Sequence, residues 1–199
     1  TKNKNELVSS HPNEGWVPFL EGKEIGAYFI DDVSQWLNYE PQLIHRARTK
    51  EVFEVPEKIL IQRITGGERP LKAAYDSNQL YNKESINNII VSETSPVSTK
   101  YILGILNSKL INWFYTNRFT NKSNLTVNLS KTYLSQIPIV IPEPSKHEQL
   151  VSYVNEIISI KKQKSSTDIS EHEKHVDELV YLLYGLNKEE IEIIEKGWI

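Results

Sequence analysis

The sequence contains no cysteine, no methionine and no long apolar run. Without cysteine the chain can form neither a disulfide, nor a thiolate zinc site, nor a cysteine nucleophile. No segment approaches the roughly 18 consecutive apolar residues of a membrane span, and no signal-peptide pattern opens the chain. We therefore expect a cytoplasmic protein that does not enter a membrane. Because the chain starts at Thr1 without Met, we also expect it to be cut from a longer protein.

Several signatures of enzymes are missing as well. The sequence has no glycine-rich phosphate loop, no Gly-x-Ser-x-Gly and no His-Glu-x-x-His. Glu21-Gly22-Lys23 matches half of a nuclease site, but no Pro-Asp partner precedes it. His172 and His175 share one face of an expected helix, yet zinc usually needs a third protein ligand, and a solvated charged face is the favoured interpretation. We expect no catalytic residue and no metal site in this chain.

Acidic residues are absent from the stretch between Thr94 and Pro142. At the chain's own frequency of 26 acids in 199 residues, about six would be expected there. The same stretch carries five cations, six asparagines and several aromatic residues. Positive charge with amide and hydroxyl donors suits a phosphate backbone and base edges. The alternative is a buried helix followed by a polar loop whose charge balance is accidental.

The net charge of -3 conceals an asymmetry along the chain. Residues 1–60 carry a net charge of -3, residues 61–135 carry +5, and residues 136–199 carry -5. Because salt screens charges beyond about 8–10 Å, the local excess in the central third matters more than the total.

A second group of basic residues precedes the acid-free stretch. In the run from His45 to Lys50, basic residues alternate with others and would share a face if the segment were extended. The alternative to a DNA-binding role for this run is a solvated loop, and the residues favour neither interpretation. The loop at 117–131 has the highest density of donors. Together these segments give the candidate DNA-binding residues Arg46, Arg48, Lys50, Arg63, Arg69, Lys72, Lys109, Arg118, Asn121, Lys122, Asn124 and Lys131.

The chain pattern predicts an α+β fold: a mixed, β-rich domain with a buried helix, followed by a C-terminal helical pair. We place a strap or linker at residues 1–19, the β-rich domain at 20–142 and the helical tail at 143–199. Short apolar runs bounded by turn residues predict the strands. These strands are Ile25–Ile30, Trp36–Tyr39, Lys58–Ile64, Leu71–Tyr75, Asn88–Ser92 and Ile137–Ile141.

Helix signals are explicit. The segment Tyr101–Tyr115 is apolar on nearly every face and predicts one buried helix, entered through Ser98 or Thr99. Three capping boxes, each a polar residue followed three positions later by glutamate, predict the helices of the tail. They begin at Ser145, Ser170 and Asn187, with Gly185 and Gly197 as C-terminal stops.

An ordered set of motifs resembles a known family. Upstream stands Leu20-Glu21-Gly22-Lys23-Glu24-Ile25; then follow Lys58–Arg63 with Ala73–Asp76, Leu103–Leu110 with Trp113-Phe114-Tyr115, Leu134–Pro142, and Val176–Leu186 with Glu190-Ile191. This set resembles the TaqI-like C-terminal specificity domain, the target-recognition part of adenine-specific DNA methyltransferases and of type IIG restriction-modification enzymes. The specificity subunits of type I systems are similar. The resemblance covers about residues 20–199.

The resemblance implies sequence-specific recognition of double-stranded DNA, on behalf of a separate N-terminal methyltransferase domain or subunit. That part would bind S-adenosylmethionine and flip the target adenine. This chain would then bind no cofactor and would not be an enzyme by itself. Its helical tail would dock the catalytic part or a second copy of the chain in a homodimer. The alternative from another class is a protein–protein module whose helical pair docks a partner without contacting DNA.

Overall fold

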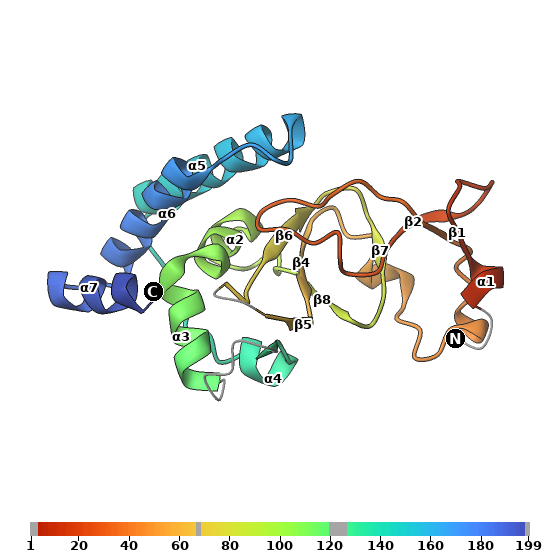
Figure 1. Cartoon of the computed structure of the whole chain (residues 1–199), viewed down its shortest axis with the longest axis horizontal. Helices are drawn as coiled ribbons and strands as arrows, with labels where there is room; N and C mark the ends of the chain where they lie inside the picture. The colour runs from red at the N-terminus through yellow and green to blue at the C-terminus, as the bar shows by residue number, and fades with distance from the viewer. Residues whose placement is uncertain (1–3, 67–68, 120–126, 198–199) are drawn as a thin grey trace.

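The computed structural model describes residues 4–66, 69–119 and 127–197 of the chain. It has the predicted α+β fold. Strands lie in the first part of the chain, and helices α5 (Pro144–Gln163), α6 (Ser170–Leu183) and α7 (Lys188–Lys196) end it. Figure 1 shows the N-terminal strands at one end of the long axis, these three helices at the other, and a central sheet between them.

The central sheet is antiparallel, with the strand order β6 (Ala73–Asp76), β4 (Lys58–Gln62), β8 (Ile86–Ile89). Three successive apolar residues of β4, from Ile59 to Ile61, have no exposed surface, because both faces of this strand are covered. The prediction of a strand at Lys58–Ile64 is confirmed for its first five residues. Beyond Gln62 the chain leaves the sheet and forms β5 (Ile64–Thr65), which pairs with β9 (Val127–Asn128).

A second sheet forms at the N-terminal end, after the short helix α1 (Lys4–Leu7). Its order is β1 (Val8–Ser9), β3 (Trp36–Leu37), β2 (Val17–Leu20), β7 (Tyr81–Asn82), and the pairing of β2 with β7 is parallel. Two single-turn helices, η1 (Pro41–Leu43) and η2 (Lys50–Val52), flank the loop that follows β3. Phe53 stacks on Tyr81 at a centroid distance of 4.4 Å and fixes the end of this segment against the sheet.

The predicted single helix Tyr101–Tyr115 is wrong: two helices, α2 (Thr99–Asn107) and α3 (Lys109–Phe119), meet at Ser108. Ser108 has an extended backbone, with φ −67° and ψ 153°. Its hydroxyl accepts a hydrogen bond from the Ile111 amide at 3.3 Å, and the buried carboxylate of Asp177 accepts one from the Lys109 amide at 2.7 Å. These acceptors cap the start of α3, so the break satisfies amides that a helix end leaves unpaired. The predicted start of α2 at Ser98 is confirmed.

The expected strand Ile25–Ile30 is also wrong, since the segment is a loop with only isolated bridges. The carboxylate of Glu24 accepts hydrogen bonds from the Glu21 and Gly22 amides at 3.1 and 2.9 Å and closes a tight turn at its start. Tyr28 has a positive φ of 70°, which reverses the chain and prevents a regular strand.

The expected strand Ile137–Ile141 forms no regular strand either. Pro138 and the following Pro142 lack amide donors, and within the described residues the segment pairs with no strand. Ile137 is buried in the core but Ile141 is 66% exposed, so this segment leaves the core and passes over the surface.

Two of the three predicted capping boxes are wrong. Helix α5 begins at Pro144 after Glu143, where the fixed φ of proline suits the first helical position. Helix α6 begins at Ser170 itself, whose hydroxyl bonds to Asp168 instead of capping the helix. The box at Asn187 is confirmed, with both of its reciprocal hydrogen bonds present.

One core cluster runs without interruption from the central sheet through α2 and α3 into the three C-terminal helices, from Ile59 to Ile194. Helix α5 approaches α2 at Gly104, where an added Cβ would lie 2.9 Å from Cγ2 of Val154. The apolar residues of the C-terminal helices are therefore largely buried. Leu182 and Ile193 stay 60% and 57% exposed.

Two buried asparagines join the helices to the edge of the central sheet. The side chain of Asn107 accepts from the Ala73 amide at 3.0 Å and donates to the Ala73 carbonyl at 2.9 Å, as a neighbouring strand would. Asn112 accepts from the Leu71 amide at 2.9 Å. These amides occupy backbone groups at an edge that would otherwise need another strand.

Candidate nucleic-acid interface

The twelve candidate DNA-binding residues fall into three groups in the structure. Six have exposed side chains: Arg46, Lys50, Arg63, Lys72, Arg118 and Lys131. Three are half-buried and engaged with other parts of the chain: Arg48, Arg69 and Lys109. The remaining three, Asn121, Lys122 and Asn124, lie outside the described residues.

The acid-free stretch returns to the sheet beside Arg63. Strand β9 pairs with β5 so that Asn128 stands opposite Ile64, and the Leu129 amide donates to the Arg63 carbonyl at 2.8 Å. The hydroxyl of the buried Tyr115 donates to the Asn128 carbonyl at 2.9 Å and fixes this ribbon to α3. The side chain of Arg63 is exposed at the start of the ribbon.

Aromatic contacts hold the end of α3 against the short helix α4 (Lys131–Leu134). Phe119 stacks on Tyr133 at a centroid distance of 5.0 Å, and the guanidinium of Arg118 lies 5.8 Å from the centre of the Phe119 ring. Tyr133 is 38% exposed. Exposed cations and a half-exposed aromatic ring therefore occur together at this corner, a combination that suits a nucleic-acid backbone.

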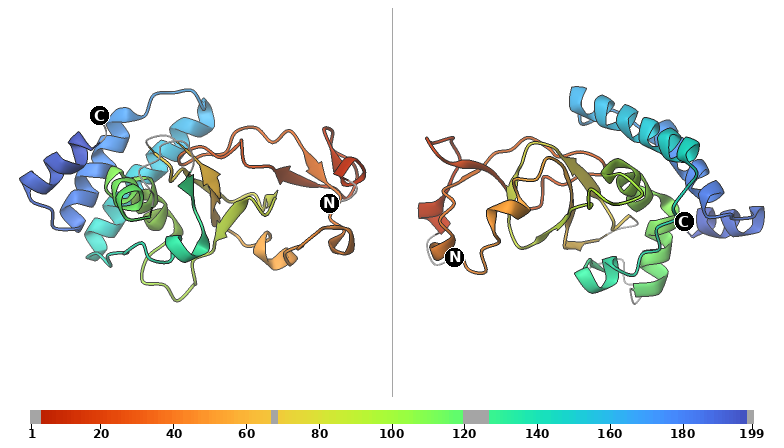
Figure 2. Two further views of the ribbon diagram at one scale, coloured as in Figure 1. Left: turned by 60° about the horizontal axis from the view of Figure 1, so that its bottom comes forward. Right: turned by 180° about the vertical axis from the view of Figure 1, so that it is seen from behind.

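The turn at residues 82–86, between β7 and β8, connects this corner with the earlier basic segment. The Arg63 amide donates to the Ser85 carbonyl at 2.7 Å, and the Arg48 guanidinium donates to the Ile86 carbonyl at 2.8 Å. Figure 1 shows the orange segment with η1 and η2, β5 and α4 toward the lower side of the molecule, and the left view of Figure 2 agrees. The 45–50 segment, Arg63 and the end of the acid-free stretch thus lie on one side of the fold.

Arg48 is held in place by this turn. Besides Ile86, its guanidinium donates to Oδ1 of Asn82 at 2.8 Å and, more weakly, to the Glu84 carbonyl at 3.4 Å. Burial lowers the pKa of Arg48 from its ordinary value, Glu84 opposes this change and Arg63 adds to it.

Arg69 and Lys109 instead face the C-terminal helices. Arg69 forms an ion pair with Glu173 of α6 at 2.6 Å, and Lys109 forms one with Glu195 of α7 at 2.8 Å. A second guanidinium nitrogen of Arg69 lies 3.8 Å from Oδ2 of Asp177. Burial raises the pKa of Asp177 to about 6, although the Lys109 amide and the nearby cations act to lower it. These two cations therefore join the tail to the domain.

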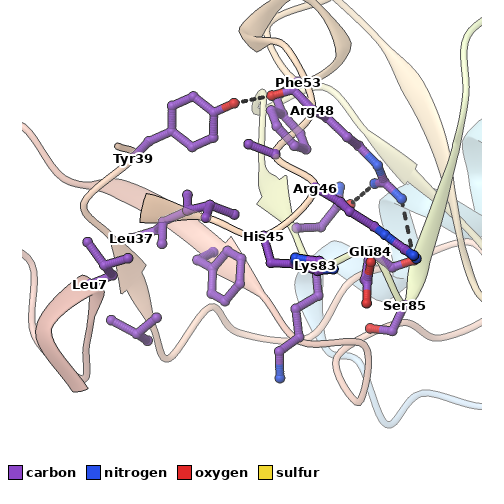
Figure 3. A pocket seen from close by; sticks show the side chains of 15 residues that line it. Leu7, Leu37, Tyr39, His45, Arg46, Arg48, Phe53, Lys83, Glu84 and Ser85 are labelled. Carbon is purple, nitrogen blue, oxygen red and sulfur yellow. Dashed lines mark hydrogen bonds between the residues drawn. The ribbon is translucent and has the colours of Figure 1, made fainter. Parts of the chain in front are cut away.

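A cavity of about 410 Å³ opens beside the basic segment. Its apolar floor comes from the N-terminal sheet, including Leu7 and Leu37, and its polar rim comes from His45–Arg48 and from Lys83–Ser85. Figure 3 shows Arg46, Lys83, Glu84 and Ser85 together on the side of the cavity away from Leu7. The turn residues Lys83, Glu84 and Ser85 were not expected here, because a short polar turn carries no signal of binding in the sequence.

The features that suggested catalysis have structural roles. Glu21 forms an ion pair with Lys83 at 2.6 Å, and Lys23 is exposed in the turn that Glu24 closes. His175 packs against Tyr153 at a centroid distance of 5.4 Å. Within the described parts of the chain, no three histidine or acidic residues lie close enough to hold a metal ion, and no helix is long and apolar enough to cross a membrane.

Comparison with known proteins agrees with this arrangement. Residues 17–139 match the family described as the TaqI-like C-terminal specificity domain. The chain belongs to this family. As a TaqI-like specificity domain it contains the part of restriction-modification enzymes that serves recognition, and the matched residues include β2, the central sheet, α2, α3 and α4.

Two relatives are longer proteins. One, from Methanocaldococcus jannaschii, is named as a candidate type II restriction enzyme and methyltransferase; it is 26% identical over 190 residues, which are 91% of this chain and 15% of that protein. The other is the type IIL restriction-modification enzyme MmeI, solved in complex with DNA. It has a TM-score of 0.69 and 10% identity, and the match covers 98% of this chain and 34% of MmeI. This second likeness shows the shared fold.

Proposed function

We propose that this chain is the sequence-specific DNA recognition module of a restriction-modification DNA methyltransferase of the N6-adenine type. Its membership of the specificity-domain family is the observation that carries the proposal. The side of the fold described above supports it, because exposed cations lie there next to a stretch without acids. The longer relatives are named as restriction-modification enzymes, and one of them was solved with DNA.

In this function the chain positions a separate catalytic part on the target site. S-adenosylmethionine would bind that part, since this sequence has no glycine-rich cofactor loop. We expect the chain alone to transfer no methyl group, and to act in the cytoplasm, where a restriction-modification enzyme finds its DNA. Transfer of a labelled methyl group to DNA by this chain alone would contradict the assignment of catalysis to another part.

The helical tail provides the second role that the sequence suggested. Leu182 and Ile193 are exposed, and Leu182 lines a cavity of about 370 Å³ between α3, α6 and α7. We propose that this surface docks the catalytic part, with a homodimer of the chain as the competing arrangement. Sedimentation of the chain carrying Leu182→Glu separates the two, because a dimer held by this surface should dissociate while a monomer would be unchanged.

Salt dependence tests DNA binding against the alternative of a protein-binding module. Fluorescence anisotropy with a labelled duplex containing the methylated site should show affinity falling steeply as salt rises. Replacing both Arg118 and Lys131 by alanine should lower the slope of log affinity against log salt by about one unit for each phosphate that the variant no longer neutralises. Binding that is independent of salt, or unchanged in the double variant, would favour the protein-binding module.

A further inference from the structure

The loop between η1 and η2 is fixed at several points. The Tyr39 hydroxyl donates to the Arg48 carbonyl, and the Arg48 guanidinium bonds to Asn82 and to the Ile86 carbonyl. At its far end the Phe53 amide donates to the Lys50 carbonyl at 2.8 Å. A loop anchored in this way keeps one conformation, so side chains at its tip are presented without a large loss of entropy on binding.

Arg46 stands at the tip of this loop in an unusual conformation. Its φ of +53° lies in the left-handed region, which costs a residue with a Cβ free energy unless its surroundings enforce it. Two other described residues that are not glycine share this feature, and both have a structural explanation: Tyr28 is buried, and the side-chain amide of Gln79 donates to the Glu54 carbonyl at 2.8 Å. Arg46 is exposed and, within the described residues, makes no hydrogen bond or ion pair.

Glu84 shares the rim of the cavity with Arg46, as Figure 3 shows. Its carboxylate is exposed and, among the described residues, is not engaged in an ion pair or hydrogen bond. The nearby Lys83 is already paired with Glu21 at 2.6 Å. A guanidinium and a carboxylate thus stand on one rim, each with its hydrogen-bonding capacity unused.

This pair fits a base edge better than a phosphate. A carboxylate would repel the DNA backbone, whereas in the major groove it accepts from the N4 amino group of cytosine. A guanidinium donates in a bidentate manner to O6 and N7 of guanine. One G·C base pair presents both of these groups side by side, so the two side chains match the two halves of a single base pair.

We propose that Arg46 and Glu84 read one G·C base pair of the target sequence, with Arg46 on the guanine and Glu84 on the cytosine. This inference rests on the proposed function and adds the residues that determine specificity. Arg48, whose donors are occupied by Asn82 and Ile86 at the turn between β7 and β8, is a positioning residue that keeps Arg46 at the tip. From the sequence alone these two arginines are equivalent.

The test is made in the full-length protein, by sequencing methylated positions in DNA exposed to each variant and by measuring affinity for matched duplexes. Arg46→Ala should relax the preference at one G·C position and lower affinity for the original site by about 5- to 150-fold. Arg46→Lys keeps the positive charge but lacks the planar guanidinium, so it should lose the base preference at the same position. Arg46→Gly removes the side chain while it accommodates the positive φ, and should give the result of Arg46→Ala.

Glu84→Gln should relax the same position, and Arg48→Ala should weaken binding at all sites without changing the order of base preferences. Lys188→Ala is the matched control, an exposed cation of α7 outside the candidate DNA-binding set, whose loss should leave the methylated sequence unchanged. If Arg46→Lys binds normally and Arg46→Ala weakens all duplexes equally, Arg46 contacts phosphate only and the proposal is wrong. Unchanged specificity in every variant also overturns it, but leaves the proposed function intact if exchange of residues 17–139 still changes the methylated sequence.

Discussion

Replacement of Lys58 by methionine should destabilise the protein by about 3–5 kcal/mol, because it breaks a fully buried ion pair. Lys58 and Asp76 have side chains with no exposed surface, and Nζ of Lys58 lies 2.5 Å from Oδ2 of Asp76. The same Nζ donates to the Phe53 carbonyl at 2.6 Å. The Asp76 carboxylate also accepts from the Asn78 and Leu80 amides at 2.8 and 3.0 Å.

The magnitude follows from the groups that the substitution leaves behind. Methionine keeps an unbranched stem of similar length, so little packing is lost. The carboxylate of Asp76 stays buried without its cation, and the Phe53 carbonyl loses a donor. A loss of this size is a large fraction of the free energy of unfolding of a typical domain, which is about 5–15 kcal/mol. It would also loosen the end of the segment that holds Arg46, since Phe53 ends that segment.

Urea unfolding followed by tryptophan fluorescence measures the effect. The matched control is Lys72→Met, at an exposed lysine close to the same sheet, for which we expect a change within about 0.5 kcal/mol. The double variant Lys58→Met with Asp76→Asn should lose less stability than the two single variants together, because the second substitution removes the unpaired charge. A cost below about 1 kcal/mol for Lys58→Met alone would refute this reasoning.

Two further predictions concern the C-terminal helices. Because burial raises the pKa of Asp177 to about 6, the folded protein binds this proton more tightly than the unfolded chain between about pH 4 and 6. Stability should therefore fall by up to about 3 kcal/mol as pH rises through that range, and thermal unfolding against pH should show a weaker fall in Asp177→Asn. Gly104→Ala should lower the free energy of unfolding by about 1–3 kcal/mol, because the added Cβ forces α5 away from α2. Gly185→Ala should lower it by about 1–2 kcal/mol, because the φ of Gly185 is +67°. Urea unfolding of each variant measures the effect, and a stability equal to that of the parent would contradict the packing argument for Gly104 or the backbone argument for Gly185.

Local signals in the sequence were sufficient for some elements. The apolar run of β4 and the capping box at Asn187 depend on neighbours within a few residues, and both were predicted. The break at Ser108 was not, because the apolar pattern continues across it and one of its caps comes from Asp177, 68 residues away. The mixed domain with a helical end was predicted, but the continuous core that joins them depends on contacts between distant segments.

The candidate site shows the same limit. Charge composition identified the basic segments, but it could not separate Arg46, which is exposed, from Arg48, which is bonded to a turn 34 or more residues away. It could not show that Arg69 pairs with Glu173, 104 residues further along the chain. Nor could it find Glu84, because an acidic residue in a polar turn carries no local signal of binding.

The central claim, that this chain selects the DNA sequence, is tested most directly by exchanging residues 17–139 with the corresponding segment of the Methanocaldococcus jannaschii relative. The exchange is made in the full-length protein, and the methylated positions are then mapped by sequencing. Our account predicts that the chimera methylates the sequence of the donor protein, since the matched segment contains the side of the fold that carries the exposed cations. An active chimera that still methylates the original sequence would contradict it.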